Sequence, residues 1–525
     1  MAIIGKPPVI APPSDGGVEA GSARLTAGRW VLAATILGSS IASIDGTAVN
    51  VALPALQEKL GASITDAQWV IEAYTLFLAA LILVGGALGD RFGRRRVYAT
   101  GVALFAISSV LCGLSQSIYQ LIAFRALQGV GGALLIPGSL SIITVFFSPG
   151  ERGRAIGTWS AFSAITTALG PVLGGWLIEN VSWRWIFFIN VPIAAAVLTM
   201  LFLRVPESRR VLSRGRVDWA GGVLATLGLA GILFGLIESS NYGFGSALVI
   251  APLVLGALAL ICFVVVEGRE ESPMMPPGLF RSATFTGANV ATLFMYGALG
   301  GVFFFLPFAL IQVYGYTATE AGASLLPIIL IIFVLSRWAG GLTDKYGARI
   351  PFAAGTVVAA AGYLSLALFN GDGSFFRTVF PGISLIGFGL ALSIAPLTTA
   401  VMNAVEVEYS GTASGINNAM ARLAGLLTIA VLGIVILHAF NGYLDAGMDT
   451  ASVPHHVREL MEGERIKMAG AEIPAALGPE MTSKLGRIVR SSFIGGFDIV
   501  LYIAATMSLL SAAIGLGTIG RKGGG

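Results

Sequence analysis

Long apolar segments alternate with short polar loops over most of this chain, from about residue 30 to about residue 518. An α-helix rises 1.5 Å per residue, so roughly 20 apolar residues cross the hydrocarbon core of a bilayer. The pattern therefore predicts an all-α polytopic membrane protein with about fourteen spanning helices. They are expected at roughly 30–53, 68–88, 97–114, 119–147, 155–178, 185–203, 218–238, 246–266, 284–312, 321–340, 350–369, 378–400, 412–437 and 493–518.

The basic residues between these segments predict the orientation of the chain. Alternate loops are rich in Lys and Arg: RFGRRR (91–96), PGERGR (149–154), RVPESRRVLSRGR (204–216) and EGREESPMMPPGLFR (267–281). The intervening loops 115–118, 239–245 and 313–319 contain neither residue. Because basic loops stay in the cytoplasm, both termini are expected there, in a multi-pass protein of the cell (inner) membrane.

A repeated motif divides the predicted helices into two halves. GGALGDRFGRRR at Gly85–Arg96 ends the second helix, and a weaker copy, GGLTDKYGAR at Gly340–Arg349, ends the tenth. Two six-helix halves with an inserted helix pair satisfy this spacing, an organisation typical of secondary transporters. The expected units are a cytoplasmic tail (1–28), an N-terminal half (29–205), a linker with the inserted pair (206–282) and a C-terminal half (283–525). The last unit includes an outer loop, 438–492, which is expected either as short amphipathic helices or as a solvated loop.

The composition supports a membrane protein and excludes several other classes. Hydrophobic residues make up 55% of the chain and charged residues 11%, with 69 glycines for close helix packing. The net charge of +4 is spread over short loops, so no nucleic-acid surface is expected. Two cysteines in apolar segments and three histidines without metal-site spacing predict no disulfide framework, metal site or cofactor. The first 28 residues lack the apolar core of a signal peptide.

Four ionisable residues fall well inside predicted spans: Asp45, Glu72, Arg125 and Arg422. Each costs about 2.5–3.5 kcal/mol to insert, so binding or coupling is the first hypothesis for all of them. Helix rise places the first three in the outer half of the membrane. Asp45 beside a buried arginine suits proton coupling, although a fixed structural ion pair is the alternative.

The remaining intramembrane polar residues are candidates for the substrate pocket. Glu72 is expected either to select positively charged substrates or only to meet water at the outer mouth. Arg422 lies near mid-membrane, where it binds an anionic group or is balanced by hydrogen bonds to Asn417 or Asn418. These alternatives stay open at this point.

Four strings in the N-terminal half resemble the motifs of a known family. SIDGTAVNVALP (Ser43–Pro54), GGALGDRFGRRR (Gly85–Arg96), RALQGVGGA (Arg125–Ala133) and ALGPVLGGW (Ala168–Trp176) are similar to the helix 1, loop 2–3, helix 4 and helix 5 motifs of the major facilitator superfamily. Together with about fourteen helices, they resemble the drug:proton antiporters of the EmrB/QacA type. The resemblance covers most of the chain and implies the major facilitator fold.

The resemblance also implies roles for individual residues. Asp45 and Arg125 would carry proton coupling. A cytoplasmic gating motif would comprise Gly86, Gly89, Asp90, Arg91, Gly93 and Arg94, with Asp344, Gly347 and Arg349 in the second half. An antiporter-type helix motif would comprise Gly170, Pro171, Gly174 and Gly175. Thr166 stands where this last motif often begins with glycine, so the closest helix contact is expected to be looser.

The sequence thus predicts a proton-coupled exporter of amphipathic organic compounds or drugs that works by alternating access. Export of one particular metabolite, sugar or lipid is the alternative. A membrane enzyme lacks support because no nucleophile–base pair or phosphate loop is recognised, and a sensor lacks an appended soluble domain. The expected partners are a small-molecule substrate, protons and the lipid bilayer, with an accessory export partner as a further candidate.

Overall fold

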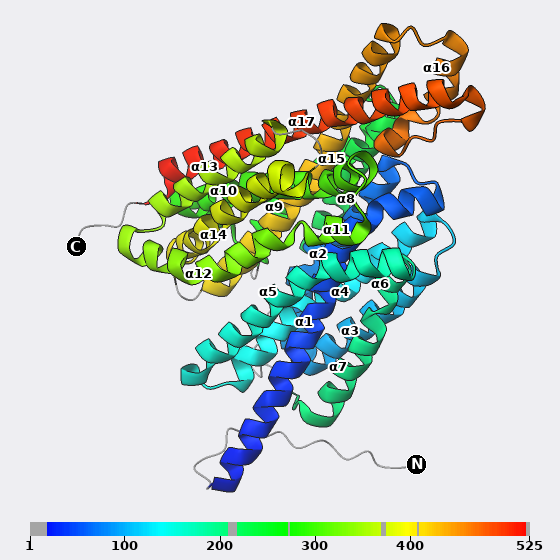
Figure 1. Cartoon of the computed structure of the whole chain (residues 1–525). Coiled ribbons are helices and arrows are strands. Elements are labelled where there is room, and N and C mark those ends of the chain that lie inside the picture. Colours follow the sequence, from blue (N-terminus) through cyan, green and yellow to red (C-terminus); the bar gives the residue numbers. More distant parts are fainter. Residues whose placement is uncertain (1–17, 208–217, 271–272, 369–373, 407–408, 521–525) are drawn as a thin grey trace.

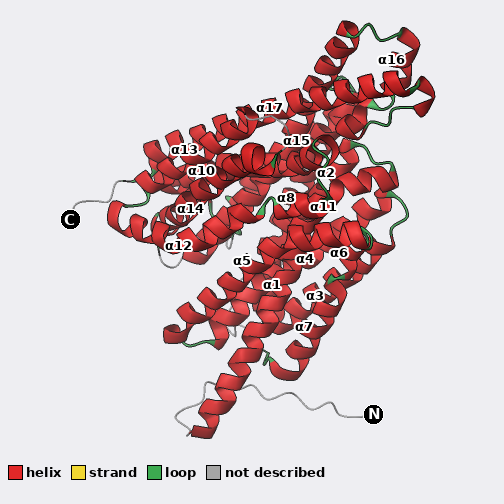
Figure 2. Ribbon diagram, in the orientation of Figure 1, coloured by secondary structure: helices red, strands yellow, loops and turns green. Residues whose placement is uncertain are grey.

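The computed structural model describes residues 18–207, 218–270, 273–368, 374–406 and 409–520, and every regular element in these ranges is helical (Figure 2). Fourteen helices in the described ranges are long and apolar enough to cross a membrane, which confirms the predicted number. Residues 1–17 of the expected cytoplasmic tail lie outside the described residues.

The first six spans are formed by seven helices. They are α1 (Val18–Leu60), α2 (Ile64–Phe92), α3 (Arg94–Leu114), α4 (Ile118–Phe146), α5 (Pro149–Asn180), and the consecutive pair α6 (Trp185–Phe188) and α7 (Asn190–Arg204). Two further spans follow, α8 (Trp219–Tyr242) and α9 (Ala247–Glu267).

The last six spans include several broken helices. They are α10 (Ala283–Phe308) continued by η2 (Ala309–Val313), α11 (Ala318–Ala323) with α12 (Leu326–Tyr346), α13 (Arg349–Leu368), η3 (Phe375–Val379) with α14 (Phe380–Asn403), α15 (Ser410–Thr450) and α17 (Pro479–Thr518). A short 3-10 turn, η1 (Pro277–Arg281), precedes α10.

Local hydrogen bonds and backbone geometry explain where α2 begins and where it gives way to α3. Ser63 caps α2 through a capping box, in which its hydroxyl accepts from the Asp66 N–H and the Asp66 carboxylate accepts from the Ser63 N–H. Gly93 separates α2 from α3 with a φ of 110°, a backbone conformation that side chains with a Cβ rarely adopt. The two helices therefore turn sharply at one glycine.

The spans form two groups that meet at one end of the bundle (Figure 1). In the first, α2 and α3 pack on α4, and α1 packs on α5; in the second, α13 packs on α14 and α17, and α10 packs on α15. The groups touch mainly through α5 with α11 and α2 with α15. We call the end that carries α16 (His455–Glu462) the capped end, and the opposite end, where α1 begins and α17 ends, the termini end. The two groups diverge toward the termini end.

Helix α8 lies beside the seam between the two groups, and α9 packs on α8. Leu233 and Ile237 of α8 share one apolar cluster with Leu76 of α2 and Leu426 of α15. Helix α9 presents many exposed, large apolar side chains along its length, as expected for a helix whose outer face contacts lipid. The pair thus adds an apolar wall along the seam.

The predicted loop 438–492 is shorter and more ordered than the sequence suggested. Helix α15 continues to Thr450 and α17 starts at Pro479, with α16, η5 (Arg465–Gly470) and η6 (Ala475–Leu477) between them. The prediction of short amphipathic helices is confirmed, because Val457 and Met461 of α16 are buried one turn apart. The solvated-loop alternative is wrong, since the apolar residues of this segment join the main core.

Close helix crossings at glycine give a first testable prediction. A Cβ on Gly389 of α14 would lie 2.5 Å from the backbone nitrogen of Ala359 in α13, so the two helices need glycine there. Gly389→Leu should lower the free energy of unfolding by about 1–3 kcal/mol through overpacking. Thermal unfolding in detergent measures this, with Gly340→Leu as the control because a Cβ there meets nothing within 4 Å. Equal loss in both variants would contradict the assigned crossing.

Candidate functional site

The structure joins two of the four intramembrane charges in one buried ion pair. Nη1 of Arg125 on α4 lies 2.5 Å from Oδ2 of Asp45 on α1, and the two side chains are 1% and 0% exposed. The expectation that a buried arginine lies beside Asp45 is therefore confirmed. Pairing offsets much of the cost of holding either charge away from water.

A hydrogen-bond network surrounds this pair and leaves little freedom in its geometry. Arg125 donates from Nε to the Val70 carbonyl (3.0 Å) and from Nη1 to Oε1 of Gln128 (2.6 Å). Gln128 in turn donates from Nε2 to Oδ1 of Asp45 (2.9 Å) and to the Ser109 hydroxyl (2.8 Å). Both Asp45 oxygens thus accept hydrogen bonds, and any change in the charge of Asp45 is felt by Arg125 and Gln128 together.

Several members of this network were not identified from sequence. Asn190 donates to Oδ1 of Asp45 at 3.4 Å, and the Arg125 guanidinium lies 4.3 Å from the centre of the Tyr74 ring. The available signal was a polar residue inside an apolar span, since Asn190 interrupts the segment WIFFINVP. Gln128, by contrast, belongs to the helix 4 motif noted in the sequence, and its spacing of one helical turn from Arg125 places both side chains on the same face.

Glu72 lies apart from the ion pair. Its side chain is 0% exposed, and neither carboxylate oxygen has a hydrogen-bond partner. On α2 it lies one turn from Gln68, which donates to the Ile429 carbonyl of α15, and one turn from Leu76 of the apolar cluster with α8. The expectation that Glu72 meets water at the outer mouth is wrong for this conformation, because neighbouring helices cover it. No described contact links Glu72 to a substrate cavity.

Arg422 and the two asparagines behave differently from one another. Asn417 donates to the Thr292 hydroxyl of α10 (2.7 Å), whereas Asn418 is exposed and donates only to the Ser414 carbonyl of its own helix. Arg422 is half-buried and forms no hydrogen bond or ion pair with any described residue. The suggestion that Asn417 or Asn418 balances Arg422 is therefore wrong.

The loop motif after α2 is held within the first group of helices. Asp90 pairs with Arg94 at 2.7 Å, and Glu207 accepts from the backbone N–H groups of Arg95 (3.0 Å) and Arg96 (3.2 Å). Among the described residues no hydrogen bond or ion pair joins this motif to the second group. A negative side chain at the first turn of α3 also complements the helix dipole.

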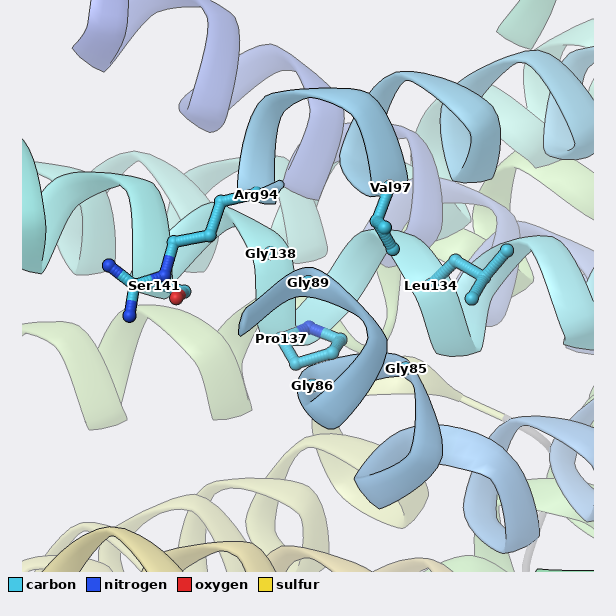
Figure 3. A pocket seen from close by; sticks show the side chains of 9 residues that line it. All are labelled: Gly85, Gly86, Gly89, Arg94, Val97, Leu134, Pro137, Gly138 and Ser141. Carbon is cyan, nitrogen blue, oxygen red and sulfur yellow. The ribbon is translucent and has the colours of Figure 1, made fainter. Parts of the chain in front are cut away.

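The glycines of this motif differ in what they permit. A Cβ on Gly85 would collide with the Ala133 carbonyl of α4, whereas Gly86 and Gly89 have ordinary room. The latter two line a small pocket with Pro137 and Arg94 (Figure 3). Close packing therefore depends on Gly85, which was not singled out from sequence.

The second copy of the motif matches the first in its backbone. Gly347 ends α12 with a φ of 76°, as Gly93 ends α2, and Arg349 begins α13. In the first copy, Arg91 has a cation–π contact with the neighbouring Phe92. The side chain of Asp344 lies outside the described part of the structure.

The helix 5 motif packs α5 against both groups. A Cβ on Gly170 or Gly174 would collide with Thr47 or Ala48 of α1. A Cβ on Gly175 would collide with the Ala318 carbonyl of α11, and a Cβ on Gly322 of α11 would collide with the Pro171 carbonyl. Small residues thus permit the closest contact between the two groups, near the capped end. Thr166 is half-buried and is not among the atoms that these glycines meet.

The buried pair gives a second prediction, on stability. Arg125→Gln leaves Asp45 as an uncompensated buried charge and should cost about 3–5 kcal/mol. The double variant Asp45→Asn/Arg125→Gln removes both charges but keeps polar groups, so it should recover most of that loss. Thermal unfolding in detergent compares the two. If the double variant is as unstable as Arg125→Gln, the pair does not carry the stability assigned to it.

The sequence of this chain is similar to those of known membrane transporters. The family model of the Major Facilitator Superfamily matches residues 35–429. The tetracenomycin C resistance and export protein of Streptomyces glaucescens is 32% identical over 93% of this chain and 91% of its own length. The cephamycin export protein CmcT of Amycolatopsis lactamdurans is 37% identical over 74% of this chain and 81% of its own.

Solved structures show the same fold. A bacterial homologue of the human lysosomal transporter Spinster, in an inward-facing and unoccupied conformation, superposes with a TM-score of 0.65 at 18% identity. That match covers 95% of this chain and 99% of the other. With the family model matching most of its length, this chain belongs to the major facilitator superfamily.

Proposed function

We propose that this protein is a proton-coupled exporter of amphipathic organic compounds, working by alternating access. The observation that carries the proposal is the buried Asp45–Arg125 pair, because a titratable carboxylate held by one arginine inside a membrane suits proton exchange better than packing. Relatives named as export or multidrug resistance proteins support the substrate class.

The charge distribution supports an orientation for the exporter. Basic residues follow α2, α4 and α7 at the termini end, so positive-inside bias assigns that end to the cytoplasm of an inner membrane. The capped end then faces outward. The tight α5–α11 contact at that end and the divergence of the groups at the other correspond to an inward-open state.

The contacts of Asp45 support proton coupling. When Asp45 takes up a proton, its attraction to Arg125 falls, and the guanidinium keeps the Val70 carbonyl, Gln128 and the Tyr74 ring as partners. Helix α1, which carries Asp45, also packs on α5 at Gly170 and Gly174. A change at Asp45 therefore acts directly on the helix that closes the seam.

The loop motif after α2 would act as the gate at the termini end, opposite the α5–α11 contact. In the inward-open state Asp90 binds Arg94 within its own group. When the termini ends approach each other, Asp90 at the end of α2 is placed to face the positive N-terminus of a helix from the second group. Exchange of partners at Asp90 then stabilises the outward-open state.

A dedicated exporter of one compound is the second candidate. Two relatives are named for single antibiotics, tetracenomycin C and cephamycin, and one relative of Mycobacterium tuberculosis is named a multidrug resistance protein. A panel of structurally unrelated fluorescent compounds, assayed for pH-dependent uptake into inside-out vesicles, separates a narrow from a broad exporter.

The third prediction tests coupling. Asp45→Asn keeps the size of the side chain but cannot exchange a proton, so uphill uptake driven by a pH gradient should fall at least tenfold. Equilibrium binding of the same fluorescent compounds should persist. Glu58→Gln, an exposed acid near the end of α1, is the control and should transport normally. Undiminished uphill uptake by Asp45→Asn would remove Asp45 from the coupling site.

The fourth prediction tests the gate. Asp90→Ala should slow turnover several-fold with little change in substrate affinity, because Asp90 biases conformations and lies far from the ion pair. Transport rate and equilibrium binding are measured on the same preparation. A large loss of affinity at normal turnover would place Asp90 in the binding site instead.

A further inference from the structure

One arginine at the seam between the two groups takes no part in the Asp45–Arg125 network. Arg422 lies about 18 Å along α15 from its start at Ser410, near mid-membrane. It is half-buried and forms no hydrogen bond or ion pair with any described residue. A cation held at this depth is costly unless it faces water or a negatively charged partner.

The neighbours of Arg422 place it at the junction of the two groups of helices. Along α15, a Cβ on Gly415 would approach Leu83 of α2, and Leu426 shares the apolar cluster with Leu76 of α2. Arg422 lies between these two contacts. Tyr74 of α2, whose ring lies under Arg125, is close enough to interact electrostatically with Arg422. Tyr74 thus lies within electrostatic range of both the coupling pair and Arg422.

The surface beside Arg422 is open. Asn418, one turn toward the termini end, is exposed. Gly425, about one turn in the other direction, has open space where a Cβ would lie. Since residues three and four apart share a helix face, Asn418, Arg422 and Gly425 form one open strip. The strip offers a positive group beside an amide, with room for a side chain at Gly425.

Neither Asp45 nor Glu72 balances Arg422. Asp45 is bound by Arg125, Gln128 and Asn190. Glu72 is fully buried, and both of its oxygens lack a partner, so it forms no hydrogen bond or ion pair with Arg422. The guanidinium donors of Arg422 are therefore not used by any described residue.

From these observations we infer that the exporter proposed above carries amphipathic organic acids, whose anionic group is bound by Arg422 at the seam. The inference rests on the proposed function and names its substrate class. A guanidinium binds a carboxylate through paired, charge-assisted hydrogen bonds, which a neutral amide cannot match. The apolar side chains of α2 that face the seam, such as Leu76, then contact the aromatic or aliphatic body of the substrate.

The test uses three probes on one fluorescent scaffold: dansylglycine (a carboxylate), dansylglycinamide (neutral) and dansylethylenediamine (an ammonium). Equilibrium binding to the purified full-length protein in lipid nanodiscs is measured at pH 7.5. The native protein should bind the carboxylate at least tenfold more tightly than the amide, and the ammonium most weakly. Arg422→Gln should abolish the preference for the carboxylate while leaving affinity for the amide nearly unchanged.

Two further variants separate a charge effect from a structural one. Arg422→Lys retains the charge without the paired donors, so it should keep part of the preference. Arg337→Gln removes another arginine that has no hydrogen bond or ion pair with any described residue. It lies on α12, which packs mainly on α14, and the variant should keep the full preference. Equal loss of all three probes in Arg422→Gln would mean a structural role and overturn the inference.

The outcome is independent of whether export is proton-coupled. A native protein that binds the amide or the ammonium as well as the carboxylate, or binds no carboxylate probe, contradicts the anion site. A preserved carboxylate preference together with absent proton-driven transport would instead contradict the proposed function and leave the anion site standing.

Discussion

The ion pair between Asp45 and Arg125 is the interaction on which the first group of helices depends. Two charges at 0–1% exposure persist inside a membrane only because each satisfies the other and because Gln128, Ser109 and Asn190 complete their hydrogen bonds. These residues come from α1, α3, α4 and α7, so one polar network ties four helices together. Apolar packing alone would hold such helices with less specificity, since lipid is as apolar as a leucine side chain.

The network also links the ion pair to the contact between the two groups, because α1 takes part in both. Its Asp45 belongs to the ion pair, while Thr47 and Ala48 on the next turn contact the glycines of α5. On its other side, α5 contacts α11 of the second group through Gly175 and Gly322. A local change of charge thus has a short, well-packed route to the contact between the two groups, with no flexible loop in between.

The sequence predicted well what depends on local patterns. Spans of about 20 apolar residues, the glycine after α2 and the Asp45–Arg125 pair all follow from helix length, backbone freedom or the cost of buried charge. Asn190 was missed because a single polar residue gives a weak signal within an apolar segment. Gly85, which makes the closest contact of the α2 glycines in the loop motif, was missed because a motif does not reveal which face meets a neighbouring helix.

Features set by long-range packing could not be predicted. Whether Glu72 meets water depends on α8 and α15, which are far away in sequence and cover its face of α2. The contacts of Asn417 depend on α10, so its separation from Arg422 was equally hidden. The ends of α15 and α17 extend beyond the expected membrane region because they continue to pack on each other, as Gly447 does against Ile488. Such contacts arise only from the assembled fold.

The central claim is that substrate and protons move in exchange through one protein. The most direct measurement reconstitutes the purified protein in liposomes without a pH gradient, imposes a gradient of a transported fluorescent compound, and follows internal pH with a trapped indicator dye. The account predicts that downhill substrate movement drives protons in the opposite direction, with no pH change in protein-free liposomes. Substrate movement at a constant internal pH would contradict proton-coupled exchange.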